Sequence, residues 1–279
     1  MIIWLASYPK SGNTWIRIFL STLLYSSDKP IVNINNNHIK QFPTRSDFDN
    51  LTDNVMDMDE FAKNCILAQQ RINLDNRIKI LKTHNAYWQN YEKNYFFTDK
   101  ENTLGVIYIV RDPRNVITSI MDYFNKKSYR ETLEFLIDNY KVIGGTKFES
   151  GIPTILFSWA NHYNSWKQFK KNYLLIKYED LLDKPQEEFL KISNYLNTIG
   201  NFKFNEKDIL EIAENCKFEN FRNQEKTKGF IDNSATNKNF KKNFFRLGPK
   251  NNWKDLLDTD IKLKIEEQFK KEMLELGYI

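Results

Sequence analysis

The N-terminal stretch constrains the fold of this chain more than any other part of it. An apolar run over residues 2–6 has the composition of a buried strand, and Pro9 and Gly12 then interrupt it with a short loop. Apolar residues return at helical spacing over residues 15–23. A strand, a loop and a helix in this order direct several backbone N–H groups and the positive end of a helix toward one place. The stretch therefore predicts an anion-binding loop.

The side chains of this loop suit a phosphate group. Lys10 adds a cation, and Ser11 and Thr14 add hydroxyl donors. The common nucleotide-triphosphate loop has its Lys directly after the last Gly. Here Lys10 precedes Gly12 and no second Gly lies upstream. The loop therefore predicts a phosphate cradle of a different kind.

Residues 8–15, YPKSGNTW, resemble the 5′-phosphosulfate loop of sulfotransferases that use 3′-phosphoadenosine 5′-phosphosulfate (PAPS). The family usually has Thr at the position of Asn13. The resemblance implies that this loop binds the donor through Lys10, Ser11, Gly12, Asn13, Thr14 and Trp15.

A second predicted strand, residues 78–84, ends in Lys82, Thr83 and His84. In an open parallel sheet ligands bind at the carboxyl ends of strands, so these residues should face the same crevice as Lys10. A single His is more often structural than catalytic, but Lys-Thr-His after a strand resembles the second conserved element of the family. The resemblance implies that His84 is the catalytic base, that Lys82 assists beside it and that Lys10 also takes part in catalysis.

The third predicted strand, residues 106–110, leads directly into a helix. Asp112 is a favourable N-cap and Pro113 suits the first helical position, which leaves Arg111 at the strand end and Ser119 two turns into the helix. Both side chains can reach one phosphate. The segment resembles the 3′-phosphate element of the family, with Arg111 and Ser119 at the binding positions.

Two later segments extend the resemblance. Tyr178 follows a fourth predicted strand and matches a Tyr that lies near the adenine, and Phe218 is a looser match to another adenine contact. Residues 244–254 resemble the C-terminal nucleotide-binding segment, in which Arg246, Gly248, Trp253 and Lys254 match. Leu247 replaces the usual Lys, so Lys250 or Lys254 is a candidate to compensate. Arg246, Leu247 and Gly248 are thus expected to bind the cofactor.

The remaining pattern alternates helices and strands. Helices are predicted over residues 58–70, 129–143, 155–171, 206–216 and 256–276, and after Pro185. His162, on an aromatic helix face, is expected to be a packing residue. We therefore expect an α/β fold: a three-layer sandwich with a central, mainly parallel sheet, a P-loop-like phosphosulfate-binding strand-loop-helix, and residues 1–279 in a single sulfotransferase domain.

Composition limits the class of protein. The hydrophobic content of 41% and the charged content of 28% are globular values, and the net charge of +5 is modest for 279 residues. Two cysteines form no disulfide or metal pattern, so a cytoplasmic location is expected. The first strand starts at once and no apolar run has spanning length, so neither a secretory signal nor a membrane span is expected. We expect no metal and no nucleic-acid partner.

The resemblance implies transfer of a sulfuryl group from PAPS to a hydroxyl, or an amine, of a small-molecule or carbohydrate acceptor, with release of 3′-phosphoadenosine 5′-phosphate (PAP). Loops at 30–50, 85–100 and 226–245 should form the acceptor pocket, and their residues suit sugars, phenols and alkaloids equally.

Two other classes stay open from the residues alone. A Mg²⁺-dependent P-loop kinase or NTPase would need an acid at a strand end, for which Asp112 is the candidate, although its capping role and the place of Lys10 argue against this. A non-catalytic nucleotide or RNA binder would use the Lys-rich segment 226–243, expected to be a mobile flap. The candidate base beside the loop argues against that class.

Overall fold

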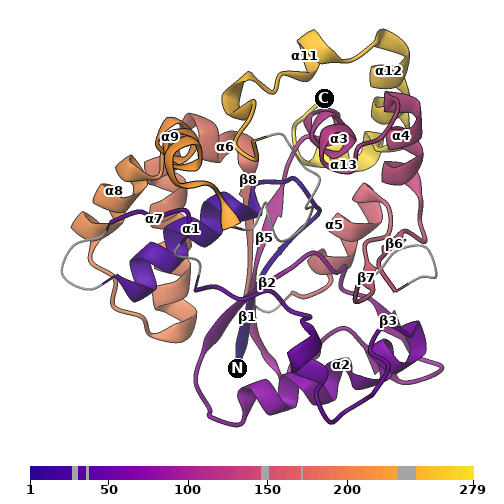
Figure 1. Ribbon diagram of the computed structural model, residues 1–279, viewed down its shortest axis with the longest axis vertical. Helices are drawn as coiled ribbons and strands as arrows, with labels where there is room; N and C mark the ends of the chain where they lie inside the picture. Colours follow the sequence, from indigo (N-terminus) through magenta and orange to yellow (C-terminus); the bar gives the residue numbers. More distant parts are fainter. Residues whose placement is uncertain (27–30, 36–37, 146–150, 171, 232–242) are drawn as a thin grey trace.

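A computed structural model describes residues 1–26, 31–35, 38–145, 151–170, 172–231 and 243–279 (Figure 1). Its centre is a four-stranded parallel sheet in the order β2-β1-β5-β8. The strands are β1 (Ile2–Ser7), β2 (Lys79–Thr83), β5 (Thr103–Val110) and β8 (Tyr173–Lys177). All four were expected from their apolar runs, and the fully parallel order confirms the predicted sheet.

Helices cover both faces of the sheet, which makes the fold a three-layer α/β sandwich (Figure 1). One face carries α1 (Asn13–Tyr25), α6 (Tyr178–Asp183), α7 (Pro185–Gly200), α8 (Glu206–Asn215) and α9 (Phe218–Lys228). The other carries α2 (Met58–Asn73), α3 (Pro113–Tyr123), α4 (Tyr129–Ile137), α5 (Trp159–Lys167), α12 (Thr259–Gln268) and α13 (Lys270–Glu275).

The apolar strands explain the two cores. Successive side chains of a strand point to opposite faces. Ile3 and Leu5 of β1 therefore pack with α1, α7 and α8, whereas Trp4 and Ala6 pack with α2, α5 and α12. Because both faces of the central strands are covered, their sequences are continuously apolar rather than alternating.

Short elements connect these layers. They are η1 (Arg45–Phe48), the hairpin β3 (Gln89–Asn90) and β4 (Tyr95–Phe96), the hairpin β6 (Val142–Ile143) and β7 (Thr154–Ile155), η2 (Gly248–Lys250) and α11 (Trp253–Leu256). In the sequence around η1, residues 40–42 join the free edge of β2: the Lys82 N–H donates to the Lys40 carbonyl, and the Phe42 N–H to the Lys82 carbonyl.

Three helix predictions were wrong in extent. The helix predicted over 129–143 ends at Ile137, since Val142 and Ile143 pair with residues 154–155 as strands. The helix predicted over 155–171 begins only at Trp159, where the Ser158 hydroxyl accepts the Asn161 N–H. The closing helix predicted over 256–276 is interrupted at Leu257 and at Phe269. In the closing segment the apolar periodicity does not reveal the breaks, because successive short helices keep the same buried face. In the other two segments, apolar residues of short strands were counted as part of a helix.

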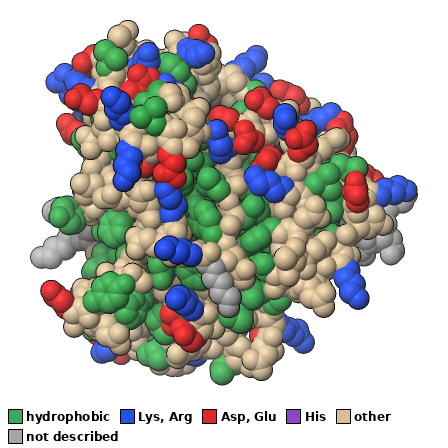
Figure 2. Space-filling view, turned by 180° about the vertical axis from the view of Figure 1, so that it is seen from behind, with side chains coloured by type: hydrophobic (Ala, Val, Ile, Leu, Met, Phe, Trp, Pro, Cys, Tyr) green, Lys and Arg blue, Asp and Glu red, His purple; other side chains and the backbone are tan. Residues whose placement is uncertain are grey.

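The back face of the molecule mixes charges of both signs. In Figure 2, Lys and Arg side chains are interspersed with Asp and Glu over the described part of this face, with hydrophobic side chains exposed between them. Within the described residues no helix combines the length and the apolar character needed to cross a membrane. Cys65 and Cys216 are free and buried on opposite faces of the sheet.

Candidate active site

A cavity of about 970 Å³ opens at the carboxyl ends of the central strands. β1 and β5 are neighbours, but the chain leaves β1 toward β2 and leaves β5 toward β8. Ligands of open α/β sheets bind at such a switch in direction. Except for Ser11, every residue expected to act in catalysis or to bind the cofactor lines this cavity, whereas Trp253, Lys250 and Lys254 of the matched C-terminal segment do not.

The phosphate loop has the conformation that its sequence predicted. Lys10 and Gly12 have φ of 67° and 102°, and α1 begins at Asn13. A Cβ on Gly12 would lie 2.4 Å from Cδ2 of Tyr178, so only glycine allows the Tyr178 ring to pack against the loop. The buried hydroxyl of Ser11 has no hydrogen-bond partner among the described residues, which fits a hydroxyl that awaits a ligand.

Asn13 ties this loop to the strand before it. Its amide Nδ2 donates to the Leu5 carbonyl and to the Ser7 hydroxyl, both at 3.2 Å. A Thr at this position has no second donor to make both bonds. Asn13, at the position where Thr is usual, therefore adds a hydrogen bond between α1 and β1.

Lys10 lies in an aromatic cage. Its Nζ is 4.3 Å from the ring centroids of both Tyr123 and Phe244. Burial lowers the pKa of Lys10 to about 7; the charge of Arg111 adds to this effect and Asp122 opposes it. A cation held by ring faces, with little water around it, is poised to gain from an incoming anion.

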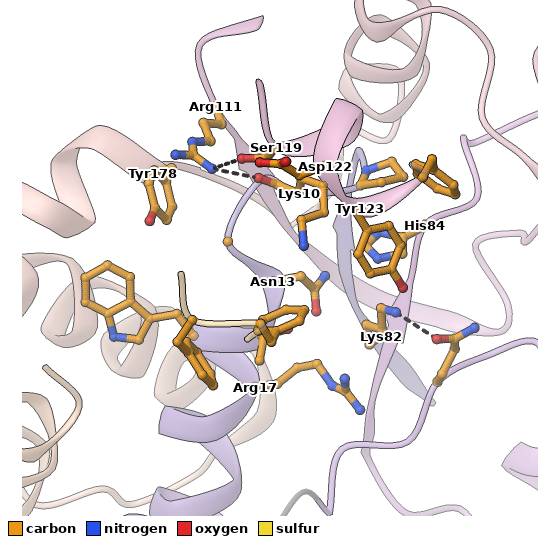
Figure 3. Close-up of a pocket in the computed structure, with 18 of the residues that line it drawn as sticks. Lys10, Asn13, Arg17, Lys82, His84, Arg111, Ser119, Asp122, Tyr123 and Tyr178 are labelled. Atoms are coloured by element: carbon orange, nitrogen blue, oxygen red, sulfur yellow. Dashed lines mark hydrogen bonds between the residues drawn. The ribbon is translucent and has the colours of Figure 1, made fainter. Parts of the chain in front are cut away.

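Arg111 joins the loop to α3. Its Nη1 donates to the Lys10 carbonyl at 3.0 Å and to the Ser119 hydroxyl at 3.4 Å, and its guanidinium lies 4.1 Å from the Tyr178 ring (Figure 3). Asn251 Nδ2 donates to the same Ser119 hydroxyl at 2.9 Å. Arg111 and the Ser119 hydroxyl thus link the β1–α1 loop, α3 and the C-terminal segment, which are distant in sequence.

His84 lies at the end of β2 with one ring nitrogen fixed. Its Nδ1 is 2.8 Å from the Ser7 carbonyl oxygen, which can only accept, so Nδ1 carries the proton. Nε2 then holds the lone pair that a base needs. Burial lowers the pKa of His84 well below its usual value, with the charge of Lys82 as the next cause, so the ring is neutral. Lys82 Nζ donates to Gln41 Oε1 at 2.7 Å.

Comparison with known proteins decides the family. The family model described as sulfotransferase domain matches residues 2–277. The chain belongs to the sulfotransferase family. It is 22% identical to an amine sulfotransferase of Oryctolagus cuniculus, over 97% of this chain and 80% of the relative. It is 25% identical to cytosolic sulfotransferase 7 of Arabidopsis thaliana, over 79% of this chain and 64% of the relative.

The fold agrees with this assignment. The crystal structure of mouse sulfotransferase SULT7A1 complexed with PAP superposes with a TM-score of 0.60, at 18% identity, over 98% of this chain and 84% of the other. The chain is therefore a sulfotransferase with the family's α/β fold, and the resemblance seen in its motifs is confirmed.

Part of the C-terminal segment, residues 244–254, lines the cavity of this sulfotransferase opposite the β1–α1 loop. Arg246, Leu247 and Gly248 all line the cavity. Arg246 forms an ion pair with Asp122 of α3, and Gly248, at φ of 51°, packs so closely on Phe218 that a Cβ would lie 2.4 Å from its ring. The close packing of Phe218 on this segment, which the sequence did not predict, explains why glycine stands here.

Other residues of this segment lie away from the cavity. The Trp253 ring stacks on the Arg114 guanidinium at 4.0 Å, so this residue supports α3 rather than the ligand site. Lys250 and Lys254 are exposed and do not line the cavity. Within the described residues, neither Lys250 nor Lys254 supplies the positive charge that a Lys at the position of Leu247 would bring to the cavity. Residues 232–242, most of the predicted flap, lie outside the described part of the chain.

Sequence reasoning missed several residues of the cavity. They are Arg17 on α1, Asp122 and Tyr123 on α3, Phe244, and Asn251. Helical spacing carried a signal for three of them: Arg17 follows Asn13 by one turn, and Asp122 and Tyr123 follow Ser119 by one turn. Asn251 lies in the C-terminal segment, but nothing in the sequence indicated that its buried amide bonds to Ser119.

Asp112 is committed to structure. Its carboxylate accepts the Arg114 backbone N–H at 2.9 Å, as an N-cap, and forms a buried ion pair with the Arg114 side chain. The kinase alternative required this acid as a Mg²⁺ ligand. In the part of the chain that the structure describes, no cluster of three or more His, Cys, Asp or Glu residues is arranged to hold a metal.

Proposed function

We propose that this sulfotransferase transfers a sulfuryl group from PAPS to a hydroxyl, or an amine, of a small-molecule or carbohydrate acceptor and releases PAP. The observation that carries the proposal is the presence of two separate basic sites on one cavity. Lys10 and its loop form the first, and Arg111 with Ser119 forms the second. PAPS has two separate phosphate groups that match them.

Buried polar atoms support a nucleotide in this cavity. Ser11 Oγ and Trp15 Nε1 are buried without a hydrogen-bond partner among the described residues. Such atoms are costly to leave unpaired, and a bound ligand can supply their partners. Trp15 lies edge-on to the Tyr178 ring, 6.0 Å between centroids, so both aromatic residues can contact an adenine. Phe218 lines the same cavity.

The proposed chemistry uses His84 and Lys10. His84 Nε2 accepts the proton of the acceptor hydroxyl as the acceptor oxygen forms a bond to sulfur. The bond between sulfur and the bridging phosphate oxygen breaks, and its electrons stay on that oxygen. Lys10 and the loop N–H groups stabilise the charge that develops there. Arg111, Ser119 and Arg246 hold the 3′-phosphate and so position the donor, while Lys82, fixed by Gln41, lies beside the base.

We further propose that residues 1–279 act as one catalytic domain in the cytoplasm, without a nucleic-acid partner. Both cysteines are free and buried, as a reducing compartment permits.

Calorimetric titration of the protein with PAP and with adenosine 5′-phosphosulfate tests the proposal. Adenosine 5′-phosphosulfate lacks the 3′-phosphate and should bind at least tenfold more weakly, because it leaves Arg111 and Ser119 without their partner. Ser119→Ala should narrow this difference, whereas Ser128→Ala, at the start of α4 and outside the cavity, should not. Equal affinity for the two nucleotides, or tighter binding of ATP with Mg²⁺, would contradict it.

A further inference from the structure

One helix binds the backbone of the segment that carries His84. β2 ends at Thr83, so residues 84–88 lie outside the ladder of the central sheet. Buried backbone groups without a strand partner need other partners. Three side chains of α5 supply them: His162 Nε2 at 3.0 Å from the His84 carbonyl oxygen, Trp166 Nε1 at 3.0 Å from the Asn85 carbonyl oxygen, and the Ser165 hydroxyl at 3.0 Å from the Tyr87 backbone nitrogen. In this segment α5 thus takes the place of a neighbouring strand.

The three side chains lie on one face of α5. Positions 162, 165 and 166 are spaced by three and four residues, which makes them neighbours on a helix. His162 and Trp166 are fully buried, and Ser165 is 5% exposed. His162 is therefore buried, as a packing residue would be, but packing alone does not require a ring with two polar nitrogens. The hydrogen bond to the His84 carbonyl is what His162 adds to the packing.

The ring of His162 has a fixed proton. The His84 carbonyl can only accept, so Nε2 of His162 carries the proton, and Nδ1 accepts a hydrogen bond from the Tyr108 hydroxyl at 2.8 Å. Burial lowers the pKa of His162 to about 4, so the ring is neutral near pH 7. Tyr108 is itself buried on the central strand β5. A chain of hydrogen bonds therefore runs from β5 through His162 to the backbone of His84.

His84 is thus fixed at two points. The Ser7 carbonyl of β1 binds Nδ1 of its ring, and His162 of α5 binds its backbone. We propose that His162 is a positioning residue for the proposed base: its Nε2–H holds the His84 carbonyl, so that the His84 ring keeps one orientation at the cavity. His162 itself does not line the cavity, so it acts only through His84. The inference rests on the proposed function, because that function makes His84 the base.

Nuclear magnetic resonance of the histidine rings tests this inference without an acceptor, because the chain has three histidines, His38, His84 and His162. His162→Gln and His162→Met introduce side chains of similar size, of which Gln alone has an N–H donor. In His162→Met the segment loosens and the His84 ring becomes less buried, so its pKa should rise toward the ordinary value of about 6.5. His162→Gln should keep the wild-type titration of His84. Lys82 and Arg17, whose charges also lower the pKa of His84, are the same in both variants.

A control on the same helix separates positioning from stability. The Tyr163 hydroxyl donates to Glu275 of α13, so Tyr163→Phe weakens the packing of α5 without touching the His84 segment. This variant should lower the melting temperature and leave the titration of His84 unchanged. If His162→Met does not fold, Trp166→Phe, which removes the other N–H donor of α5, should raise the pKa of His84 instead. Equal titration of His84 in the Met and Gln variants, or the same shift in Tyr163→Phe, overturns the inference.

Kinetics with an identified acceptor connect the inference to activity. His162→Met should lower turnover about tenfold, because a displaced base loses alignment with the acceptor, whereas PAP affinity should not change. His162→Gln should keep most of the turnover. Wild-type turnover in His84→Ala would contradict the base role in the proposed function. An unchanged His84 titration in His162→Met, with PAP binding intact, contradicts only the role of His162.

Discussion

The two ends of the cavity are built differently. At the proposed donor end, Arg111 donates to the Lys10 carbonyl of the β1–α1 loop, Arg111 and Asn251 of the C-terminal segment both donate to Ser119 of α3, and aromatic rings lie against the cations Lys10 and Arg111. At the proposed acceptor end, the His84 ring bonds to the Ser7 carbonyl of the neighbouring strand, and Lys82 donates to the Gln41 side chain. We infer that the connected contacts of the donor end suit a ligand that is the same in every reaction, as the proposed donor PAPS would be. We infer that the proposed acceptor end orients the candidate base His84 and leaves the shape of the acceptor less constrained.

The largest expected effect separates chemistry from donor binding. His84→Ala should lower turnover by about two orders of magnitude or more and leave PAP affinity nearly unchanged, because the proposed mechanism gives His84 the acceptor proton and no contact with the nucleotide. His38→Ala, an exposed histidine outside the cavity, is the control. Steady-state kinetics and calorimetry measure the two quantities. Wild-type turnover in His84→Ala would require another base. Glu92 and Asp99 would then be the first candidates, although neither lines the cavity.

The second prediction tests the interlocking of the donor end. Gly12→Ala places a Cβ against the Tyr178 ring and forces a non-glycine residue to φ of 102°. Backbone strain of this kind costs on the order of 1–3 kcal/mol, and the ring must also move. We expect a lower melting temperature and a weaker stabilisation by PAP. Gly277→Ala, at φ of 70° with nothing within 4 Å, is a control for strain without the ring contact. If both variants lose equal PAP affinity, the ring contact is unimportant.

The third prediction concerns protons at the donor end. The pKa of Lys10 is lowered to about 7 in the empty site, mainly by burial, so Lys10 is increasingly neutral above pH 7. A bound phosphate favours the ammonium form and raises this pKa again. PAP binding should therefore take up a fraction of a proton above pH 7, and PAP affinity should fall as the pH rises through this range. Calorimetry in buffers of different ionisation enthalpy measures the uptake. Lys10→Met should abolish it, and an uptake that persists in this variant would place the proton elsewhere.

The smallest effect is expected at the rim of the donor end. Asp122 holds Arg246 in a partly exposed ion pair that a 3′-phosphate would have to compete with. Asp122→Asn removes this competition and should tighten PAP binding about two- to fivefold, in line with the modest strength of exposed pairs. Because such pairs are screened by salt, the gain should shrink at high ionic strength. Weaker PAP binding by Asp122→Asn would show that the ion pair positions Arg246 for the phosphate instead.

Local sequence was sufficient to predict the backbone elements around the proposed donor site. The apolar strand, Gly12 and the apolar spacing after it predicted a strand, a tight loop and a helix, and Asp112 with Pro113 predicted a helix start that leaves Arg111 at a strand end. These features depend on backbone conformation and capping, which neighbouring residues control. The four central strands were found for the same reason, since each is a short apolar run bounded by polar residues.

Tertiary structure alone decided the contacts between distant segments. Asn251 bonds to Ser119 across 132 positions of the chain, Phe244 covers Lys10, and Trp253 supports Arg114 rather than the ligand. Helical spacing puts Arg17 one turn after Asn13, but only the packing of α1 on the sheet brings Arg17 into the same cavity as Lys82 (Figure 3). Residue type and spacing determine which groups are available near a strand end. Long-range packing determines which of them share a low-dielectric space, and therefore which charges act on one another.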